Sequence, residues 1–194
     1  MACNMHVMGS FLRNYIGTMG QTASTITSSS DNQAAWHACG ARHVAVYGTL
    51  RAGGVNDIAR LQPGIVRTGV TTLVGTLHDL GWYPGLSLDG TQSVLAEVYP
   101  LNDALEQAMD GIEGIWPHDF GEYAKRILEV KVALPDGDEQ SLRVLFYEAL
   151  PAILQGAPVI DASDWLVWYH DTGRRHPDEP FCLKTENSAA PSAG

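Results

Sequence analysis

The sequence is poor in basic residues. Its 194 residues contain 12 Lys and Arg against 22 Asp and Glu, which gives a formal net charge of −10. A protein that binds nucleic acid needs a basic face to neutralise phosphates, and no such face is visible in this sequence. The composition therefore argues against a nucleic-acid partner and is compatible with an enzyme that acts on small molecules.

Cysteines and long apolar runs are also scarce. The three cysteines, Cys3, Cys39 and Cys182, lie far apart and form no C-x-x-C pair, so neither a disulfide framework nor a zinc site is predicted. No segment approaches the roughly 18 apolar residues of a membrane span. The first ten residues lack the basic-then-apolar order of a signal peptide. We expect a reduced, cytoplasmic chain without membrane association.

Several common catalytic motifs are absent. The sequence contains no G-x-S-x-G, no G-x-x-x-x-G-K-[ST] and no G-x-G-x-x-G. His170, Asp171 and His176 lie close in sequence, but their polar, Arg-containing surroundings favour a solvated end over a set of metal ligands. The pair His78-Asp79 is read as a surface pair at a strand end. We expect neither a metal nor an organic cofactor.

Composition divides the chain into three parts. Residues 1–42 include a Ser/Thr tract at 22–32 with no apolar period, which predicts a flexible N-terminal extension. Residues 184–194 are small and polar and are expected to form a disordered tail. The remaining residues, 43–183, have the size of one domain. A hydrophobic fraction of 45%, with five Trp and seven Tyr, is sufficient to fill its core.

Strand patterns dominate residues 43–183, and helical patterns are fewer. Strands are predicted at 43–47, at 64–80 as a pair or one bent strand, and at 93–99, 123–134 and 141–149, with a hairpin turn at 135–138. Helices are predicted at 102–113, capped by Asn102 or Asp103, and at 161–170, capped by Asp161, with a short turn at 56–61. This order predicts an α+β fold, a small and mostly antiparallel β-barrel with flanking short helices.

The apolar run at 44–46 ends in Tyr47-Gly48-Thr49-Leu50-Arg51. Glycine permits the crowded geometry of a tight turn, and successive amide protons in such a turn form a concavity suited to a carboxylate or another oxyanion. The guanidinium of Arg51 is close in sequence. The alternative is that the glycine merely begins a loop.

Glu113 ends the predicted helix at 102–113 and is flanked by Ile112, Ile115 and Trp116. In an apolar pocket, desolvation would raise the pKa of its carboxyl and make it a general base near neutral pH. The alternative is a solvated Glu at a helix terminus. Tyr123 opens a predicted strand, either with its hydroxyl available to a ligand or as a core tyrosine with a solvated tip.

These segments together resemble the gamma-glutamylcyclotransferase-like superfamily, specifically its avirulence-induced-gene-like and gamma-glutamylamine cyclotransferase branch. The resemblance covers about residues 43–170 and implies a β-barrel with flanking helices and a cavity at one end. The segments that carry it, in order, are Tyr47–Arg51, Tyr83–Leu86, Ala96–Tyr99, Met109–Gly114, Gly121–Arg126 and Val144–Tyr147.

The resemblance also implies roles for individual residues. The backbone amides of the turn formed by Tyr47, Gly48, Thr49, Leu50 and Arg51 would hold the α-carboxylate of a substrate. Glu113 matches the catalytic glutamate of the family's Asp-x-x-Glu pattern, and Tyr123 matches a tyrosine that lines the same cavity. Lys125 stands where the family commonly has Arg, which weakens a prediction of bidentate ligand binding there.

The function implied is that of a cyclotransferase, grouped with transferases or lyases, which releases 5-oxoproline and a free amine from a γ-glutamyl amide. Some members of the branch lack the glutamate, and its presence here favours an enzyme. The alternative is a non-catalytic domain of the same fold that binds a small carboxylate or serves as an interaction module. The expected partner is a small-molecule γ-glutamyl substrate, and the chain is expected to be a monomer or homodimer.

Overall fold

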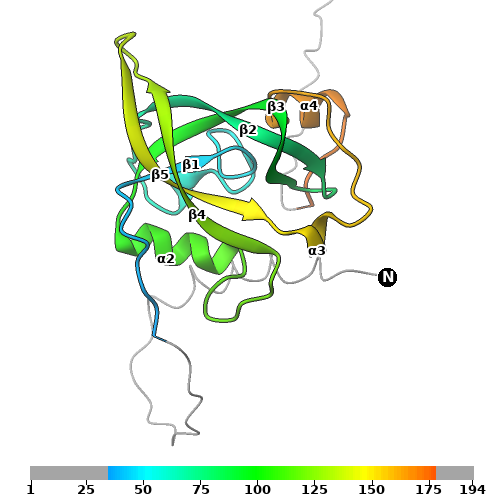
Figure 1. Cartoon of the computed structure of the whole chain (residues 1–194), viewed down its shortest axis with the longest axis horizontal. Helices are drawn as coiled ribbons and strands as arrows, with labels where there is room; N and C mark the ends of the chain where they lie inside the picture. Colours follow the sequence, from blue (N-terminus) through cyan, green and yellow to red (C-terminus); the bar gives the residue numbers. More distant parts are fainter. Residues whose placement is uncertain (1–34, 178–194) are drawn as a thin grey trace, which may run out of the picture.

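The computed structural model describes residues 35–177. Within them, strands close into a barrel in the order β1-β3-β2-β4-β5 (Figure 1). Neighbouring strands are antiparallel except β1 and β5, which pair in parallel. The predicted fold, a small and mostly antiparallel barrel with flanking short helices, is confirmed. The strands are β1 (His43–Val46), β2 (Gly69–Asp79), β3 (Pro84–Pro100), β4 (Tyr123–Ala133) and β5 (Glu139–Ala149).

The hairpin of β2 and β3 differs most from the predicted strands. The strand predicted at 93–99 is only the second half of the 17-residue β3. Its first half pairs with the end of β2 after a register shift between Gly75 and Thr76. A Cβ atom at Gly75 would lie 2.1 Å from the carbonyl oxygen of Ser87, so the close approach of the two strands requires glycine there. Proline and glycines in the first half of β3 hide its strand pattern in the sequence.

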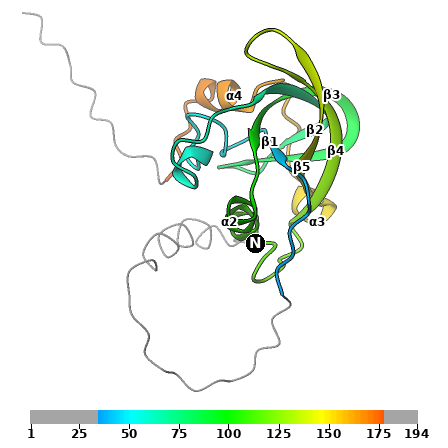
Figure 2. The same ribbon diagram turned by 90° about the vertical axis from the view of Figure 1, so that its left-hand side faces the viewer.

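Short helices connect and flank these strands. Helix α2 (Asp103–Ile112) begins as predicted at Asn102, whose side chain accepts a hydrogen bond from the amide of Leu105 at 2.9 Å. Helix α4 (Trp165–Asp171) is capped by Asp164, so the predicted cap at Asp161 was wrong. The 3-10 helix η2 (Ile58–Arg60) lies within the predicted short turn, and helix α3 (Pro151–Leu154) was not predicted. Figure 2 shows the loop after β1 and helix α4 on the same side of the barrel, away from the β4–β5 hairpin.

The core has two parts that share the strands as a wall. One cluster fills the barrel and includes Val144 and Phe146 of β5. The other lies between the barrel and α2 and includes Leu145 and Tyr147 of the same strand. Because successive side chains of a strand point to opposite faces, β5 contributes to both clusters. This alternation directs Tyr147 towards α2, the helix at whose end Glu113 lies.

Part of the predicted N-terminal extension contacts α2. The indole Nε1 of Trp36 donates a hydrogen bond to Asp110 at 2.7 Å, and the amide of Cys39 donates one to Glu106 at 2.8 Å. The remainder of that extension, residues 1–34, and the predicted tail at 184–194 lie outside the described residues. The predicted division of the chain at residue 42 therefore stays a prediction. Within residues 35–177, no helix has the length and apolar character needed to cross a bilayer.

Candidate active site

The turn that follows β1 is held through its carbonyl groups. The carbonyls of Gly48, Thr49 and Leu50 accept hydrogen bonds from the backbone amides at positions 51, 56 and 58, at distances of 3.1, 3.0 and 3.0 Å. The amides of the same three residues donate no hydrogen bond to any acceptor within residues 35–177. Gly48 and Leu50 are buried, and buried amides rarely stay unpaired. The turn therefore presents successive free donors, as an anion-binding turn does.

Close packing explains why the turn needs a glycine. A Cβ atom at Gly48 would lie 2.6 Å from the Cγ atom of Pro84, the first residue of β3. The carbonyl of Pro84 in turn accepts a hydrogen bond from the hydroxyl of Tyr123 at 3.2 Å. Tyr123 is the first residue of β4, as predicted, and its ring is buried. Gly48, Pro84 and Tyr123 thus form one packed unit at this end of the barrel.

Glu113 is the C-cap residue of α2, and its amide donates to the carbonyl of Met109. The residue is partly exposed, and no hydrogen bond joins its carboxyl to the described residues. Crowding by surrounding atoms desolvates the carboxyl, and this burial, with the nearby charges of Asp110 and Glu122, raises its pKa from 4.5 to about 8. Desolvation, the effect expected from the sequence, is the main cause of this shift in the pKa of Glu113.

The charge of Glu113 acts on the hydroxyl groups of Tyr47, Tyr123 and Tyr147. Burial raises the pKa of each of these tyrosines well above its ordinary value, and the charge of Glu113 raises it further. All three hydroxyls therefore stay protonated at neutral pH. Tyr47 directly precedes the turn, so the charge of Glu113 acts on a side chain that adjoins the free amides of Gly48–Leu50.

The three hydroxyl groups differ in whether they donate a hydrogen bond within the protein. The hydroxyls of Tyr123 and Tyr147 donate to the carbonyl of the first residue of β3 and to Asp110, at 3.2 and 2.8 Å. The hydroxyl of Tyr47 instead accepts a hydrogen bond from the amide of Leu86 at 3.0 Å. No acceptor among residues 35–177 takes its proton. Tyr47 is therefore the tyrosine of this group that is able to donate to a bound ligand.

Two buried carboxylates of α2 form ion pairs with Lys125. Glu106 and Asp110 are each 1% exposed, and the Nζ atom of Lys125 lies 2.7 Å from an oxygen of both. Burial alone would lower the pKa of Lys125, but its hydrogen bonds to Asp110 and Glu106 raise it overall. Asp110 also accepts from Tyr147 and Trp36, so its buried charge is fully paired. Lys125 is thus occupied by the carboxylates of the protein.

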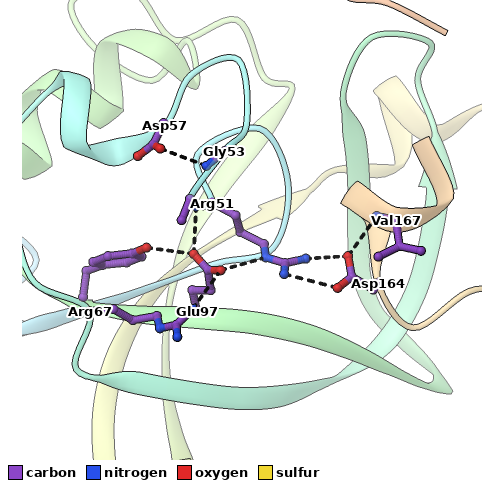
Figure 3. A network of polar contacts seen from close by, with 9 residues as sticks. Arg51, Gly53, Asp57, Arg67, Glu97, Asp164 and Val167 are labelled. Carbon is purple, nitrogen blue, oxygen red and sulfur yellow. Dashed lines mark hydrogen bonds and ion pairs between the residues drawn. The ribbon is translucent and has the colours of Figure 1, made fainter. Parts of the chain in front are cut away.

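Arg51 lies apart from the other predicted site residues. It is 6% exposed, and its Nη1 and Nη2 atoms donate to the carboxylate of Asp164 at 2.7 and 3.2 Å (Figure 3). Its Nε atom forms an ion pair of 3.5 Å with Glu97 on β3. Tyr47, the turn and Tyr123 are thus linked through contacts with the first half of β3, and the charge of Glu113 acts on both tyrosines. The guanidinium of Arg51 is instead paired with Asp164 and Glu97. The substrate contacts of all these residues stay predictions.

Sequence reasoning gave no role to Glu97 or Asp164. Glu97 interrupts an apolar strand segment, and a charge at such a position is a signal of a buried polar network. Asp164 lies directly before an apolar helical pattern, which is the position of an N-cap. Neither signal identifies Arg51 as the partner of both residues, because that pairing depends on the fold.

Comparisons with known proteins identify the family of this chain. The family model for gamma-glutamyl cyclotransferase, AIG2-like, matches residues 44–167. A search of the curated proteins gives no significant match. Similar solved structures include protein PH0828 from Pyrococcus horikoshii, with 20% identity over 70% of this chain and 99% of that chain and a TM-score of 0.44.

Two further solved structures are similar to this chain. Protein ytfP from Escherichia coli has 26% identity over 64% of this chain and 96% of that chain, with a TM-score of 0.42. A structure named gamma-glutamyl cyclotransferase has 20% identity over 62% of this chain and 72% of that chain, with a TM-score of 0.40. Because the family model covers well over half of the 194 residues, the chain belongs to the AIG2-like gamma-glutamyl cyclotransferase family.

Proposed function

We propose that this protein converts a γ-glutamyl amide into 5-oxoproline and a free amine, with Glu113 as the general acid and base. One observation carries the proposal. The carboxyl of Glu113 has no hydrogen-bond partner among residues 35–177 and has a pKa raised to about 8, and its charge acts on Tyr47, which leads into a turn with free amides. Family membership supports cyclotransferase chemistry in general, and the substrate and the roles of the residues are our inference.

In this proposal the Gly48–Leu50 amides bind the α-carboxylate of the substrate. That contact leaves the γ-carbonyl and the α-ammonium group of the substrate facing Glu113. Both reacting groups belong to one molecule, so holding that molecule in one conformation is enough to bring them together. The reaction therefore avoids the entropy cost of joining two separate reactants, and this supplies most of the rate gain. The enzyme then has to transfer protons and stabilise one developing charge.

Glu113 transfers these protons. Its carboxylate takes a proton from the α-ammonium group, and the freed amine attacks the γ-carbonyl carbon. A carbon–nitrogen bond closes the five-membered ring, and the original amide bond breaks. Glu113 returns this proton to the departing nitrogen, which leaves as a neutral amine. The ring nitrogen still carries two hydrogens after the attack, and its second proton passes through Glu113 to solvent. A base with a pKa of about 8 suits these transfers near neutral pH.

Tyr47 stabilises the negative oxygen that forms during ring closure. Its hydroxyl accepts from the amide of Leu86, which fixes its position, and its own proton is free to donate. Burial raises the pKa of this hydroxyl, so the proton stays in place at the pH of the reaction. A fixed donor at a developing oxyanion typically contributes about 10²–10³ in kcat.

The test is release of 5-oxoproline from a panel of γ-glutamyl amines, γ-glutamyl dipeptides and glutathione. The Glu113→Gln variant should lose at least about 10³-fold in kcat, because general acid–base catalysis is lost, while its thermal unfolding stays cooperative. Glu122→Gln is a matched control, since Glu122 is a neighbouring, partly buried carboxyl that we place outside the reaction. It should keep turnover, with a pH profile moved to lower pH because the charge of Glu122 contributes to the raised pKa of Glu113. Turnover by Glu113→Gln at the wild-type rate would refute the assignment. If the wild type released no 5-oxoproline from any member of the panel but was stabilised against thermal unfolding by these ligands, the non-catalytic binding domain would be favoured.

A further inference from the structure

A buried polar network clamps the segment directly after the Gly48–Leu50 turn. Glu97 on β3 is 4% exposed, and its Oε2 atom accepts from the amide of Ala52 at 2.9 Å and from the hydroxyl of Tyr99 at 2.8 Å. Its Oε1 atom accepts from Arg67 at 3.2 Å and forms the ion pair with Arg51 (Figure 3). The chain at positions 51 and 52 is thus tied to the barrel wall through both a side chain and the backbone.

Asp164 extends this clamp to helix α4. Its carboxylate receives both Nη atoms of Arg51, and its Oδ1 atom also caps α4 by accepting from the amide of Val167 at 3.2 Å. The hydrogen bonds of Arg51 join residues 113 positions apart in the sequence. The pairing with Arg51 lowers the pKa of Asp164 against the opposing effect of its burial, so the carboxylate stays charged.

Asp164 occupies the terminal nitrogens of Arg51 that would otherwise bind an anion. The guanidinium presents a planar fork, and Asp164 occupies that fork with two hydrogen bonds. The positive charges of Arg51 and Arg67 are balanced by the negative charges of Glu97 and Asp164. A bound carboxylate would therefore be held by the amide dipoles of the turn and not by a nearby net charge.

We propose that Arg51, Glu97 and Asp164 are positioning residues that hold the Gly48–Leu50 amides in the geometry that binds the substrate carboxylate. This inference rests on the proposed function only in assuming that the turn binds that carboxylate. Asp164 acts on the ligand through Arg51, and Glu97 acts through Arg51 and the amide of Ala52. Helix α4 thereby contributes to binding without contacting the ligand.

Asp164→Asn provides a test, because electrostatics and the positioning role predict opposite changes in the affinity of the turn for an anion. Asparagine is a good N-cap, so α4 keeps its capping group. The substitution removes a negative charge near the turn and frees Arg51, so electrostatics alone predicts tighter binding of an anion. A loosened clamp predicts weaker binding, with Kd for L-5-oxoproline rising about tenfold or more, because small misplacements of binding groups are costly. Isothermal titration calorimetry with L-5-oxoproline measures this without any turnover.

Asp79→Asn is the matched control. Both carboxylate oxygens of Asp79 accept from one nitrogen of Arg174, Nη1, at 2.8 and 2.7 Å, and this ion pair includes none of the three clamp residues. Loss of the Asp79–Arg174 pair should leave the Kd for L-5-oxoproline unchanged. A second variant, Arg51→Lys, keeps the positive charge but loses the fork and should also weaken binding. The double variant of Arg51→Lys and Asp164→Asn should bind L-5-oxoproline no more weakly than the weaker-binding single variant, because both substitutions break the same contact.

The outcomes separate this inference from the proposed function. Equal or tighter binding of L-5-oxoproline by Asp164→Asn would overturn the inference, and so would absence of binding by the wild type. Weaker binding by both Asp164→Asn and Arg51→Lys, with the control unchanged, would support it. Absence of turnover by a wild type that binds L-5-oxoproline would overturn the proposed function and leave the positioning role supported or refuted by the calorimetry alone.

Discussion

Replacing Glu113 by Gln should stabilise the fold, and the gain should grow as the pH rises. Burial raises the pKa of the Glu113 carboxyl from 4.5 to about 8, so between these values the folded state keeps a proton that the unfolded state releases. The free energy of unfolding of the wild type therefore falls by up to about 1.4 kcal/mol per pH unit across this window. Glutamine has no proton to titrate there, and the variant lacks this loss.

The size of the effect follows from the width of the window. Between pH 5 and pH 8 the stability difference between variant and wild type should grow by at most about 4 kcal/mol. Glu113 is partly exposed, so water screens part of the cost of its ionisation. We therefore expect a growth of about 2 kcal/mol. Such a gain would mean that the catalytic carboxyl is held at the expense of stability, as active sites often require.

Urea denaturation followed by tryptophan fluorescence, repeated at each pH unit from 5 to 8, measures this difference. Other groups titrate in both proteins, so their contributions cancel in the difference. Glu129→Gln removes an exposed carboxylate of the same size from β4 and should change stability by less than about 0.5 kcal/mol at every pH. A difference for Glu113→Gln that does not change with pH, or that falls as the pH rises, would refute the reasoning.

Three further predictions concern catalysis. Asp110→Asn removes a charge that adds to the raised pKa of Glu113, so the acidic limb of the kcat/KM profile should move from about 8 to lower pH, and a limb that stays in place would count against this coupling. Tyr47→Phe should lower kcat about 10²–10³-fold with little change in KM, and an unchanged kcat in steady-state assays would remove Tyr47 as the oxyanion donor. Gly48→Ala should lower kcat/KM at least about tenfold, since its Cβ would lie 2.6 Å from a Pro84 side-chain atom, and wild-type kinetics would show that the turn adapts.

The parts of the fold that local chemistry determines could be predicted from the sequence. Helix α2 follows from a capping Asn102 and from Leu105, Met109 and Ile112 at spacings of four and three. The end of β1 at a glycine turn and the apolar surroundings of Glu113 likewise depend on residues adjacent in the chain. For these features the sequence contains both the signal and its physical cause.

The parts that depend on distant contacts could not be predicted in this way. The first half of β3 is a strand because β2 pairs with it, although Pro84 and the following glycines disfavour a strand locally. The cap of α4 is Asp164, and nothing local shows that its carboxylate also holds Arg51. A guanidinium beside a predicted anion-binding turn favours direct contact with the ligand, and only the fold reveals that the fork of Arg51 is already filled.

The segment that carries Trp36 and Cys39 affects the choice of an N-terminal boundary for expressing this domain. The family match begins at residue 44, after that segment, so a boundary drawn from homology would discard both donors. Asp110 would lose an indole proton and Glu106 a backbone amide, and both carboxylates would remain buried with fewer partners. A shortened chain of that kind would be a poor standard for the acidity of Glu113, since helix α2 would have lost two of its hydrogen-bond donors.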